Sequence, residues 1–574
     1  MKVSFRFPHT ASSNATREYR RRVLLQLCVL VTVLPLAWRG ASCGHDFDFH
    51  LQSWLEAAQA WRHGVFYPHW MAAANYGAGE PRFVFYPPLT WMLGALLGTV
   101  LPWTWTPLAF TLVALAGCVA AFYTMACEWM THDAAAVAAC LYLVNPYLLF
   151  VAYERTAYGE LVSAAWMPLL VLFALRQRPA AVPLALVVAA LWLTNAPSAV
   201  MGCYLLAVIV AVAAIRERSL RLVLRAAWGV VLGLGMAAVY VWPALYEQRW
   251  VEIARAVAPG MRIEDSFLFG YTGAPFHDQV LRTASWIAVA LLGSALAGAL
   301  LARDKRRGLW LPMTAAAALA ALLLFPWSDV IWRTMPEMKF LQFPWRWLLV
   351  MGMAAAALAG LALRGQFQEA ATRGAIRTRA VTILTITVLM TLLASHFFWQ
   401  FCDDEDNVRA QRATLQAEGF EGSDEYTPSR VKNAEVEQQT PLVRVLRRAD
   451  AGEASSVDPE NPDWKPDVEN TIAAAVQTRV KGAERMSFTI DSPQPGFAVL
   501  RLLEYPAWQV RRNGQTVSAR PHREDGLMTI PIAAGRSQIT VHYAATGDMW
   551  TGRGIAAASL LVLLALKKRG KLQI

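Results

Sequence analysis

Two carboxylates and two imidazoles lie within a span of six residues, directly after the first long apolar run: His45, Asp46, Asp48 and His50. Charges at the edge of a hydrocarbon phase are costly unless they are paired or used. Asp46 and Asp48 could bind a divalent cation such as Mg²⁺ or Mn²⁺, or one of them could be a general base toward an acceptor hydroxyl. Both are candidate catalytic and metal-binding residues, and the histidines are candidate substrate-binding residues. The alternative is a polar loop that is simply solvated.

A second polar cluster interrupts the apolar sequence near residue 155. It contains Glu154, Arg155 and Glu160. These charges also need partners at a membrane boundary. They are candidate substrate-binding residues, and a structural Glu–Arg pair, Glu154 with Arg155, is the alternative.

The third cluster, at 337–347, contains Lys339, Gln342 and Arg346. Basic residues are expected mainly on the cytoplasmic side, whereas this segment is expected outside. The phosphate of an anionic lipid carrier would explain them, because arginine offers a planar fork of donors. We therefore take all three as candidate substrate-binding residues. Snorkelling of the basic groups to lipid headgroups is the alternative.

Aromatic residues are dense after the first cluster. They could form an interfacial belt, or a platform for sugar faces or a lipid chain. Residues 50–63 are expected to form an amphipathic helix that lies on the membrane. The aromatic residues are Trp54, Trp61, Phe66, Tyr67, Trp70, Tyr76, Phe83, Phe85 and Tyr86.

The composition indicates which elements must position these clusters. Of 574 residues, 56% are hydrophobic and 17% are charged, against about 25% charged in ordinary soluble domains. A membrane span needs roughly 20 apolar residues. The net charge is +11, but the basic residues lie between apolar runs, as the positive-inside rule requires, so no nucleic-acid partner is expected.

The apolar runs predict an α-helical polytopic membrane protein with about 12–13 transmembrane helices. Both ends are expected inside, which requires an even number of crossings, so one of the thirteen candidates is not a simple span. The short runs at 87–103 and 161–175 are the ones that we expect to be re-entrant or merged. The thirteen runs are 23–38, 87–103, 107–127, 134–152, 161–175, 181–195, 198–215, 226–246, 284–302, 308–326, 345–364, 380–399 and 553–566.

These runs divide the chain into regions. We expect a cytoplasmic N-terminus at 1–22, a transmembrane module at 23–399 with outer loops at 39–86, 247–282 and 327–344, an extracytoplasmic linking region at 400–485, a β-sandwich at 486–552, and a final helix with a basic cytoplasmic tail at 553–574. Cys43 and Cys402 both fall near the outer membrane face and could form a disulfide.

The region after residue 486 changes to short alternating segments that predict an antiparallel β-sandwich with Trp508 at least partly buried. Asn513-Gly514 is typical of a type I′ hairpin turn, and Ala534-Gly535 is a second turn signal. The predicted strands are Ser487–Asp491, Phe497–Leu503, Trp508–Arg512, Thr516–Arg520, Leu527–Ile532 and Gln538–Tyr543.

The acidic motif after the first helix, followed by Trp61-Arg62-His63-Gly64-Val65-Phe66-Tyr67-Pro68-His69-Trp70, resembles the GT-C superfamily of membrane glycosyltransferases. This resemblance implies a polyprenyl-phosphate sugar as donor. It implies Asp46, with Asp48 second, as base or metal ligand, and it suits Arg346 and Lys339 as holders of the carrier phosphate.

Further segments are similar to the bacterial YfhO-like membrane proteins and to the group labelled "6-pyruvoyl-tetrahydropterin synthase-related" membrane proteins. They are residues 153–160, residues 341–346, Tyr505-Pro506-Ala507-Trp508-Gln509-Val510, Asn513-Gly514 and Pro531-Ile532-Ala533-Ala534-Gly535. The sequence departs from the YfhO-like pattern at Ala507, where Gly is more usual, and at Asn513, where Asp is. The resemblance implies a location in the bacterial inner membrane. The basic clusters at 364–379 and 567–571 predict that the large C-terminal domain lies outside.

The leading hypothesis is therefore transfer of a sugar from a polyprenyl-phosphate donor to an envelope glycan or protein acceptor, in contact with membrane lipids. The alternatives are a transporter or flippase of envelope lipids and a non-catalytic envelope assembly protein. Transporters often contain repeated halves and ionisable groups near the membrane centre, whereas here no halves repeat and the charges gather at one face.

Overall fold

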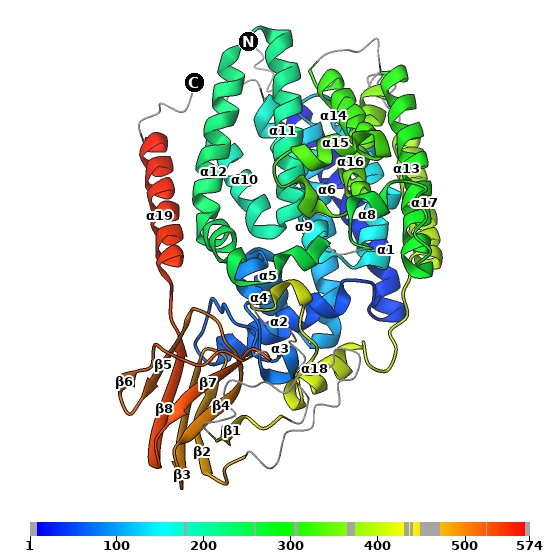
Figure 1. Ribbon diagram of the computed structural model, residues 1–574. Helices are drawn as coiled ribbons and strands as arrows, with labels where there is room; N and C mark the ends of the chain where they lie inside the picture. The colour runs from blue at the N-terminus through cyan, green and yellow to red at the C-terminus, as the bar shows by residue number, and fades with distance from the viewer. Residues whose placement is uncertain are drawn as a thin grey trace, which may run out of the picture.

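The computed structural model describes residues 9–176, 181–257, 260–302, 308–363, 373–429, 436, 440–447, 471–523 and 525–568. Some predicted features lie outside the described residues: the first eight residues, the basic clusters at 303–307 and 364–372, residues 448–470 of the linking region and the tail at 569–574. The described chain forms a large helical bundle with a β-domain against one end (Figure 1).

The bundle is built from the predicted apolar runs. In the described residues, nine helices are long and apolar enough to cross a membrane, two further candidates are bent helix pairs, and two apolar helices are shorter. The nine spans contain α1 (His9–Arg39), α6 (Thr106–Ala126), α9 (Tyr158–Leu175), α11 (Ala196–Glu217), α12 (Leu220–Glu247), α13 (Pro275–Leu301), α16 (Leu348–Leu363), α17 (Arg373–Phe397) and α19 (Gly547–Lys568).

The bent pairs and short helices complete the set. The first pair joins α7 (His132–Leu143) to α8 (Pro146–Phe150) and the π-helical turn η2 (Val151–Arg155), with a bend of 42°; the second joins α14 (Trp310–Leu323) to η7 (Pro326–Ser328) and α15 (Asp329–Thr334), with a bend of 97°. The short helices are α5 (Pro88–Val100) and α10 (Ala181–Thr194). The chain is thus an integral, polytopic, α-helical membrane protein.

Helix α5 stays within one end of the bundle and does not reach the other end. Thr90 donates to the carbonyl of Thr194 (2.7 Å) where α10 ends, whereas Tyr123, near the end of α6, donates to Glu18 (2.9 Å) near the start of α1. The 21 residues of α6 span about 32 Å, so α6 starts where α5 ends. At 13 residues, α5 is only about 20 Å long and does not cross. Among the described residues, the nine long helices and the two bent pairs give up to eleven spans by length and composition, and α10 is the other short helix.

The prediction for the short runs is therefore correct for one and wrong for the other. The run 87–103 corresponds to the non-crossing α5. The run 161–175 is part of α9, whose 18 residues are long enough to span. The second short helix is instead α10, with 14 residues, which connects the far end of α9 to the start of α11.

The β-domain is an antiparallel sandwich, as predicted. One sheet has the order β1-β4-β7 and the other β2-β3-β8-β5-β6. Buried side chains from both sheets, including Phe488, Leu500, Ile530 and Ile539, form its core. The strands are β1 (Val443–Leu446), β2 (Ala475–Gly482), β3 (Arg485–Ser492), β4 (Gly496–Leu503), β5 (Trp508–Arg512), β6 (Gln515–Thr516), β7 (Leu527–Ile532) and β8 (Gly535–Tyr543).

The turn and the buried tryptophan predicted for this domain are both present in the structure. Asn513 and Gly514 both have positive φ (50° and 82°) between β5 and β6, as a type I′ turn requires, and Trp508 is buried. Two details differ. The predicted strand Thr516–Arg520 is reduced to the two residues of β6, and β1 and β2 come from the region that was expected to link rather than to join the sheets.

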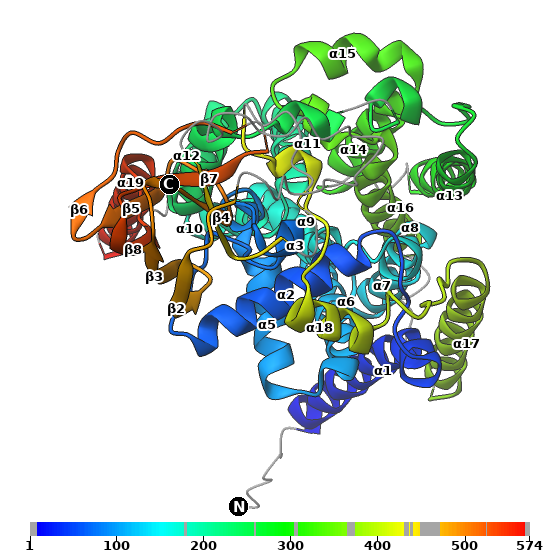
Figure 2. The ribbon, with the colours of Figure 1, turned by 60° about the horizontal axis from the view of Figure 1, so that its bottom comes forward.

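The first loop lies between the bundle and the β-domain and contacts both. Its helix α2 (Phe47–Arg62) runs across the end of the bundle, beneath α18 (Val408–Ala417) (Figure 2). Gln52 of α2 donates to Gln411 of α18 (2.9 Å), and most of α2 is buried. The helix was predicted, but its position on the membrane surface was wrong because protein covers nearly all of its faces.

The aromatic residues of this loop do not form a common belt. Trp54 is buried and stacks on Phe110 of α6, and Trp70 is buried in the core of the β-domain against Trp508. Phe66, by contrast, is exposed. The loop also contains the short helices α3 (Ala74–Gly77) and α4 (Arg82–Phe85).

Candidate active site

A break in the bundle positions the first two polar clusters. After α8 the chain makes the π-helical turn η2, and Thr156 then takes a left-handed conformation (φ 48°) before α9 begins. This irregular backbone leaves carbonyls free: that of Glu154 accepts from the N–H of His45 (3.2 Å) and that of Arg155 from the N–H of Asp46 (2.9 Å). π-helical turns are frequent at functional sites.

Gly44 allows the first loop to approach this turn closely. A Cβ at that position would lie 2.0 Å from the carbonyl oxygen of Glu154, which a real side chain could not tolerate. The first and second clusters, more than 100 residues apart, are therefore held together by backbone hydrogen bonds.

The charges of these segments form one continuous network around Arg155. This guanidinium contacts Glu160 (2.6 Å) and Asp46 (3.2 Å). Glu160 also accepts from the hydroxyl of Tyr147 (2.6 Å) and lies 3.8 Å from Nε of Arg346. Acids and bases from the residue before α2, from η2, from α9 and from η9 (Pro344–Trp347) thus meet at the β-domain end of the bundle.

The side chains of the network range from fully buried to partly exposed. The side chains of Arg155 and Glu160 are 3% and 4% exposed, and that of Arg346 is 12% exposed. The Asp46 carboxylate is 38% exposed. Asp46 is therefore the member that a substrate from solvent reaches first, with Arg155 fixing one of its oxygens.

Arg346 is anchored on one side only. Its Nη1 donates to the carbonyl of Leu341 (2.7 Å), while its buried Nε has no hydrogen-bond partner in the described part of the chain. Gln342, which has positive φ (61°), donates to the carbonyl of Ala256 (2.6 Å) and lies 3.4 Å from Arg346. The guanidinium therefore retains donor capacity for a further acceptor.

Other predicted site residues lie beside the network but are not joined to it. His50 is buried and its Nδ1 lies 2.7 Å from the hydroxyl of Tyr86; burial lowers its pKa to about 4. His45 packs against Phe276, and burial and the nearby Arg155 lower its pKa to about 4. Both imidazoles are thus neutral at physiological pH.

Asp48, Glu154 and Lys339 are placed differently from the core of the network. Asp48 is exposed and lines two cavities of about 260 and 760 Å³, both shared with Asp406. Glu154 is buried next to Arg155, yet Arg155 forms its ion pairs with Asp46 and Glu160. Lys339 is exposed over the ring of Phe340.

The residues do not form an evident cage for a divalent cation. Among the described residues, no group of three or more His, Cys, Asp or Glu side chains could hold a metal ion, and Asp46 already faces Arg155. A cation held with Asp46 and Asp48 stays a prediction, and no step below depends on it.

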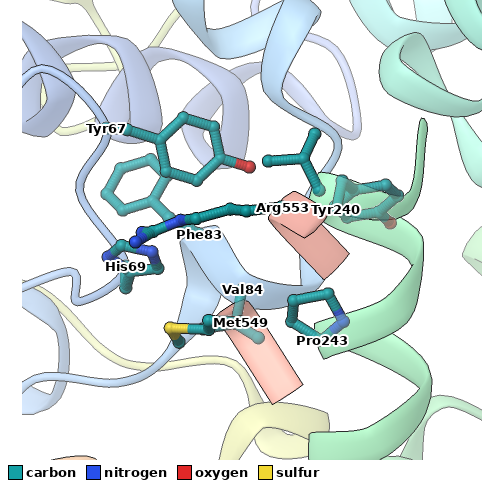
Figure 3. Close-up of a pocket in the computed structure, with 9 residues that line it drawn as sticks. Tyr67, His69, Phe83, Val84, Tyr240, Pro243, Met549 and Arg553 are labelled. Atoms are coloured by element: carbon teal, nitrogen blue, oxygen red, sulfur yellow. The ribbon is translucent and has the colours of Figure 1, made fainter. Parts of the chain in front are cut away.

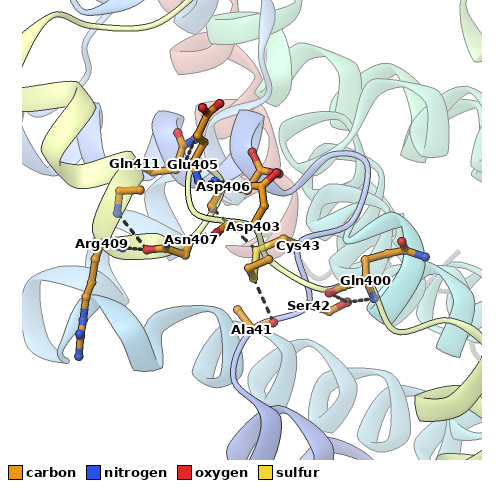
Figure 4. Close-up of a disulfide and its surroundings, with 12 residues drawn as sticks. Ala41, Ser42, Cys43, Gln400, Asp403, Glu405, Asp406, Asn407, Arg409 and Gln411 are labelled. Atoms are coloured by element: carbon orange, nitrogen blue, oxygen red, sulfur yellow. Dashed lines mark hydrogen bonds between the residues drawn. A yellow bond between two sulfur atoms is a disulfide. The ribbon is translucent and has the colours of Figure 1, made fainter.

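A disulfide fastens the loop that carries Asp46. Cys43 is bonded to Cys402 in the segment after α17, 359 residues away. Backbone contacts flank the bond: Cys43 N–H donates to the carbonyl of Gln400 (3.1 Å), and Gln400 N–H donates to the Ser42 hydroxyl (3.0 Å) (Figure 4). The disulfide considered from the sequence is confirmed.

Some members of the site were missed by sequence reasoning. Tyr147 follows Asn145-Pro146, a helix-start signal, but nothing local indicates that its hydroxyl reaches Glu160. The ring of Trp345 lies 4.8 Å from the Arg155 guanidinium. Glu80 and Arg82 form an ion pair (2.5 Å). Arg82 donates to the hydroxyl of Ser423 in the linking region, and the N–H of Ser423 donates to Glu80.

No protein-family model matches this chain, and no curated protein matches it. Among solved structures, the chain is similar to the oligosaccharyltransferase of Archaeoglobus fulgidus in complex with zinc and sulfate, with 14% identity and a TM-score of 0.34 over 67% of this chain and 54% of that one.

The chain is also similar to arabinofuranosyltransferase AftD from Mycobacteria, with 12% identity and a TM-score of 0.41 over 92% of this chain and 57% of that one. A mutant structure of AftD gives 11% identity and a TM-score of 0.42, covering 92% and 60%. This chain thus spans little more than half the length of these membrane glycosyltransferases.

Proposed function

We propose that this membrane protein is a glycosyltransferase that moves a sugar from a polyprenyl-phosphate donor to a cell-envelope glycan or protein on the extracytoplasmic face of the bacterial inner membrane. The observation that carries the proposal is the network Asp46–Arg155–Glu160–Arg346. It combines an accessible carboxylate and a partly satisfied guanidinium at the end of the helical bundle.

The chemistry needs a base and a stabilised leaving group. The acceptor hydroxyl attacks the anomeric carbon, a new carbon–oxygen bond forms and the bond to the carrier phosphate breaks. The free oxygen of Asp46 accepts the hydroxyl proton, and the polyprenyl phosphate leaves with the bonding electrons. Arg346 stabilises the developing phosphate charge through its remaining donors.

Arg155 and Glu160 are positioning residues in this scheme. Arg155 orients Asp46 and is itself oriented by Glu160. The ring of Trp345 covers the guanidinium, which excludes water from that side. A group fixed by buried partners loses little mobility when substrate binds.

The test is the substitution Asp46→Asn in protein reconstituted into liposomes with labelled polyprenyl-phosphate hexoses and pentoses. We expect transfer to fall by roughly 10²–10⁴-fold, the usual contribution of a general base. Asp424→Asn, at an exposed carboxylate of the linking region, is the matched control and should retain activity.

Retention of the Cys43–Cys402 disulfide and of the thermal unfolding midpoint shows that the Asp46→Asn protein is folded. Transfer by the variant at a rate close to that of the wild type would contradict the proposal. It would favour the alternatives, an envelope-lipid transporter or an assembly protein.

A further inference from the structure

A separate cavity lies where the last helix meets the first loop. Its volume is about 240 Å³. Residues from the first loop, α4, α12 and α19 line it (Figure 3). The main contributors are Tyr67, His69, Phe83, Tyr240, Met549 and Arg553. None of the residues that line this cavity belongs to the Asp46 network.

The cavity contains a cation in an unusual place. Arg553 lies six residues into α19, about 9 Å along the helix axis, at the β-domain end of an apolar span. A charge at this depth is costly unless it is used or paired. In the described part of the chain its contact is with the ring of Trp550 (4.9 Å), and no ion pair to a carboxylate satisfies it.

The side chain does not turn toward the surrounding lipid. Figure 3 shows Arg553 extending across the cavity beneath Tyr67, with its guanidinium directed toward His69. The backbone N–H of His69 donates to the carboxylate of Glu484 (2.6 Å), and the ring of His69 stacks on Tyr543. Snorkelling would bring the charge to the headgroups around the protein, whereas this geometry directs it into the cavity.

The size and walls of the cavity limit what it can take. Pockets that enclose a whole small molecule measure about 300–1,000 Å³, so a cavity of about 240 Å³ accommodates one part of a larger molecule. Val239 and Pro243 of α12 and Met549 of α19 form an apolar side. An occupant with a charged head and a hydrocarbon chain would satisfy both sides.

We propose that this cavity binds the phosphate group of a membrane lipid, with the Arg553 guanidinium as the principal ligand and the lipid chain leaving along α12 and α19. A guanidinium matches phosphate oxygens with two parallel hydrogen bonds. The site is distinct from the Asp46 network and does not depend on glycosyl transfer.

The experiment measures lipid binding to the full chain in detergent by native mass spectrometry. The probes are phosphatidic acid and diacylglycerol with the same chains, which differ only in the phosphate, and inorganic phosphate. We expect the wild type to bind phosphatidic acid at least tenfold more tightly than either other probe. Arg553→Gln should weaken this binding roughly 10- to 100-fold, the range for a lost charge-assisted bond.

Two further variants make the result specific. Val239→Phe leaves Arg553 in place but fills the cavity, and should also weaken binding at least tenfold. Arg282→Gln removes an exposed arginine seven residues into α13, at a comparable depth but not among the residues that line this cavity, and should change little.

Equal binding of phosphatidic acid by the Arg553→Gln variant and the wild type would overturn the proposal, as would an equal loss in the Arg282→Gln variant. Diacylglycerol bound as tightly as phosphatidic acid would exclude recognition of phosphate. Inorganic phosphate bound as tightly would show that the ligand is free phosphate and not a lipid.

Discussion

Glu160 shows how a buried charge is accommodated in this protein. It is 3% exposed, yet it is contacted by Tyr147, Arg155 and Arg346, so no oxygen lacks a partner. Removing one member of a buried ion pair typically costs about 3–5 kcal/mol. The arrangement therefore fixes Arg155 and, through it, the exposed Asp46. Asp48, two residues away, faces other cavities and receives no such support.

Glu56 provides a test of burial at the scale of a single residue. This carboxyl on α2 is 3% exposed, and burial raises its pKa to about 7 from 4.5. Its contribution to stability is fully present below pH 4.5 and is lost as the pH rises to about 7. A shift of this size corresponds to about 3 kcal/mol. We expect the stability of the wild type relative to Glu56→Gln to fall by this order between these pH values.

Thermal unfolding of both proteins in detergent between pH 4.5 and 8 measures this difference. His50 acts in the opposite sense, because its lowered pKa of about 4 makes its contribution disappear as the pH falls below 6.5. Both proteins contain His50, so its effect cancels. A difference that does not vary with pH would show that folding does not raise the pKa of Glu56.

At the scale of elements, α5 is the part of the bundle that departs from a simple span. It is short and stays at one end of the bundle, and α2 packs against it. Gly94 makes this contact possible, because a Cβ there would lie 2.2 Å from the indole of Trp54. The loop with Asp46 thus rests on a helix that packs closely against α2.

Gly94→Ala should therefore destabilise the protein by about 1–3 kcal/mol, the usual cost of overpacking a core. Gly293→Ala is the matched control, since nothing lies within 4 Å of a Cβ at that position of α13. It should be neutral or stabilising by up to about 1 kcal/mol. Thermal unfolding measures both, and equal effects would contradict the packing of α2 on α5.

The disulfide is the second element-scale constraint on the site. It joins the start of the first loop to the segment that leads into α18. Cys43→Ser should lower the free energy of unfolding by about 2–5 kcal/mol and weaken the packing of α18 on α2. Cys127→Ser, which removes a free cysteine, is the control.

Mass spectrometry after alkylation, with and without reductant, tests the bond directly. Cys43 and Cys402 should react only after reduction. Alkylation of both without reductant would show that the bond does not form.

At the scale of the whole molecule, the basic clusters predict that the N-terminus and the C-terminal tail lie on the same side of the membrane. The β-domain lies at the opposite end of the bundle (Figure 1). The first loop and α12 hold it there: the N–H of Leu503 donates to the carbonyl of Ala78 (2.9 Å) in the first loop, and Tyr505 donates to Glu247 at the end of α12.

This topology predicts a labelling pattern in cells. A cysteine introduced at Gln515, exposed on the β-domain, should react with a membrane-impermeant maleimide in intact cells. A cysteine at Arg216, exposed at the far end of α11, should react only after permeabilisation. The reverse pattern would invert the proposed orientation, and labelling of both in intact cells would contradict the predicted topology.

The sequence by itself determined the apolar helices, the alternating strands and the turn at Asn513-Gly514. It did so because burial and backbone conformation leave periodic or compositional signals within a few residues. It also located acids and bases at the ends of apolar runs, where an unpaired charge is costly.

Only the tertiary structure decided which of those charges meet. Asp46, Arg155, Glu160 and Arg346 come from segments up to 300 residues apart, and Tyr147 and Trp345 join them without any local signal. The same holds for α5. Its composition resembles that of a membrane span, but its position among its neighbours keeps it at one end of the bundle. Such pairings depend on how distant elements pack together, and a periodic pattern along the chain contains no information about its partner.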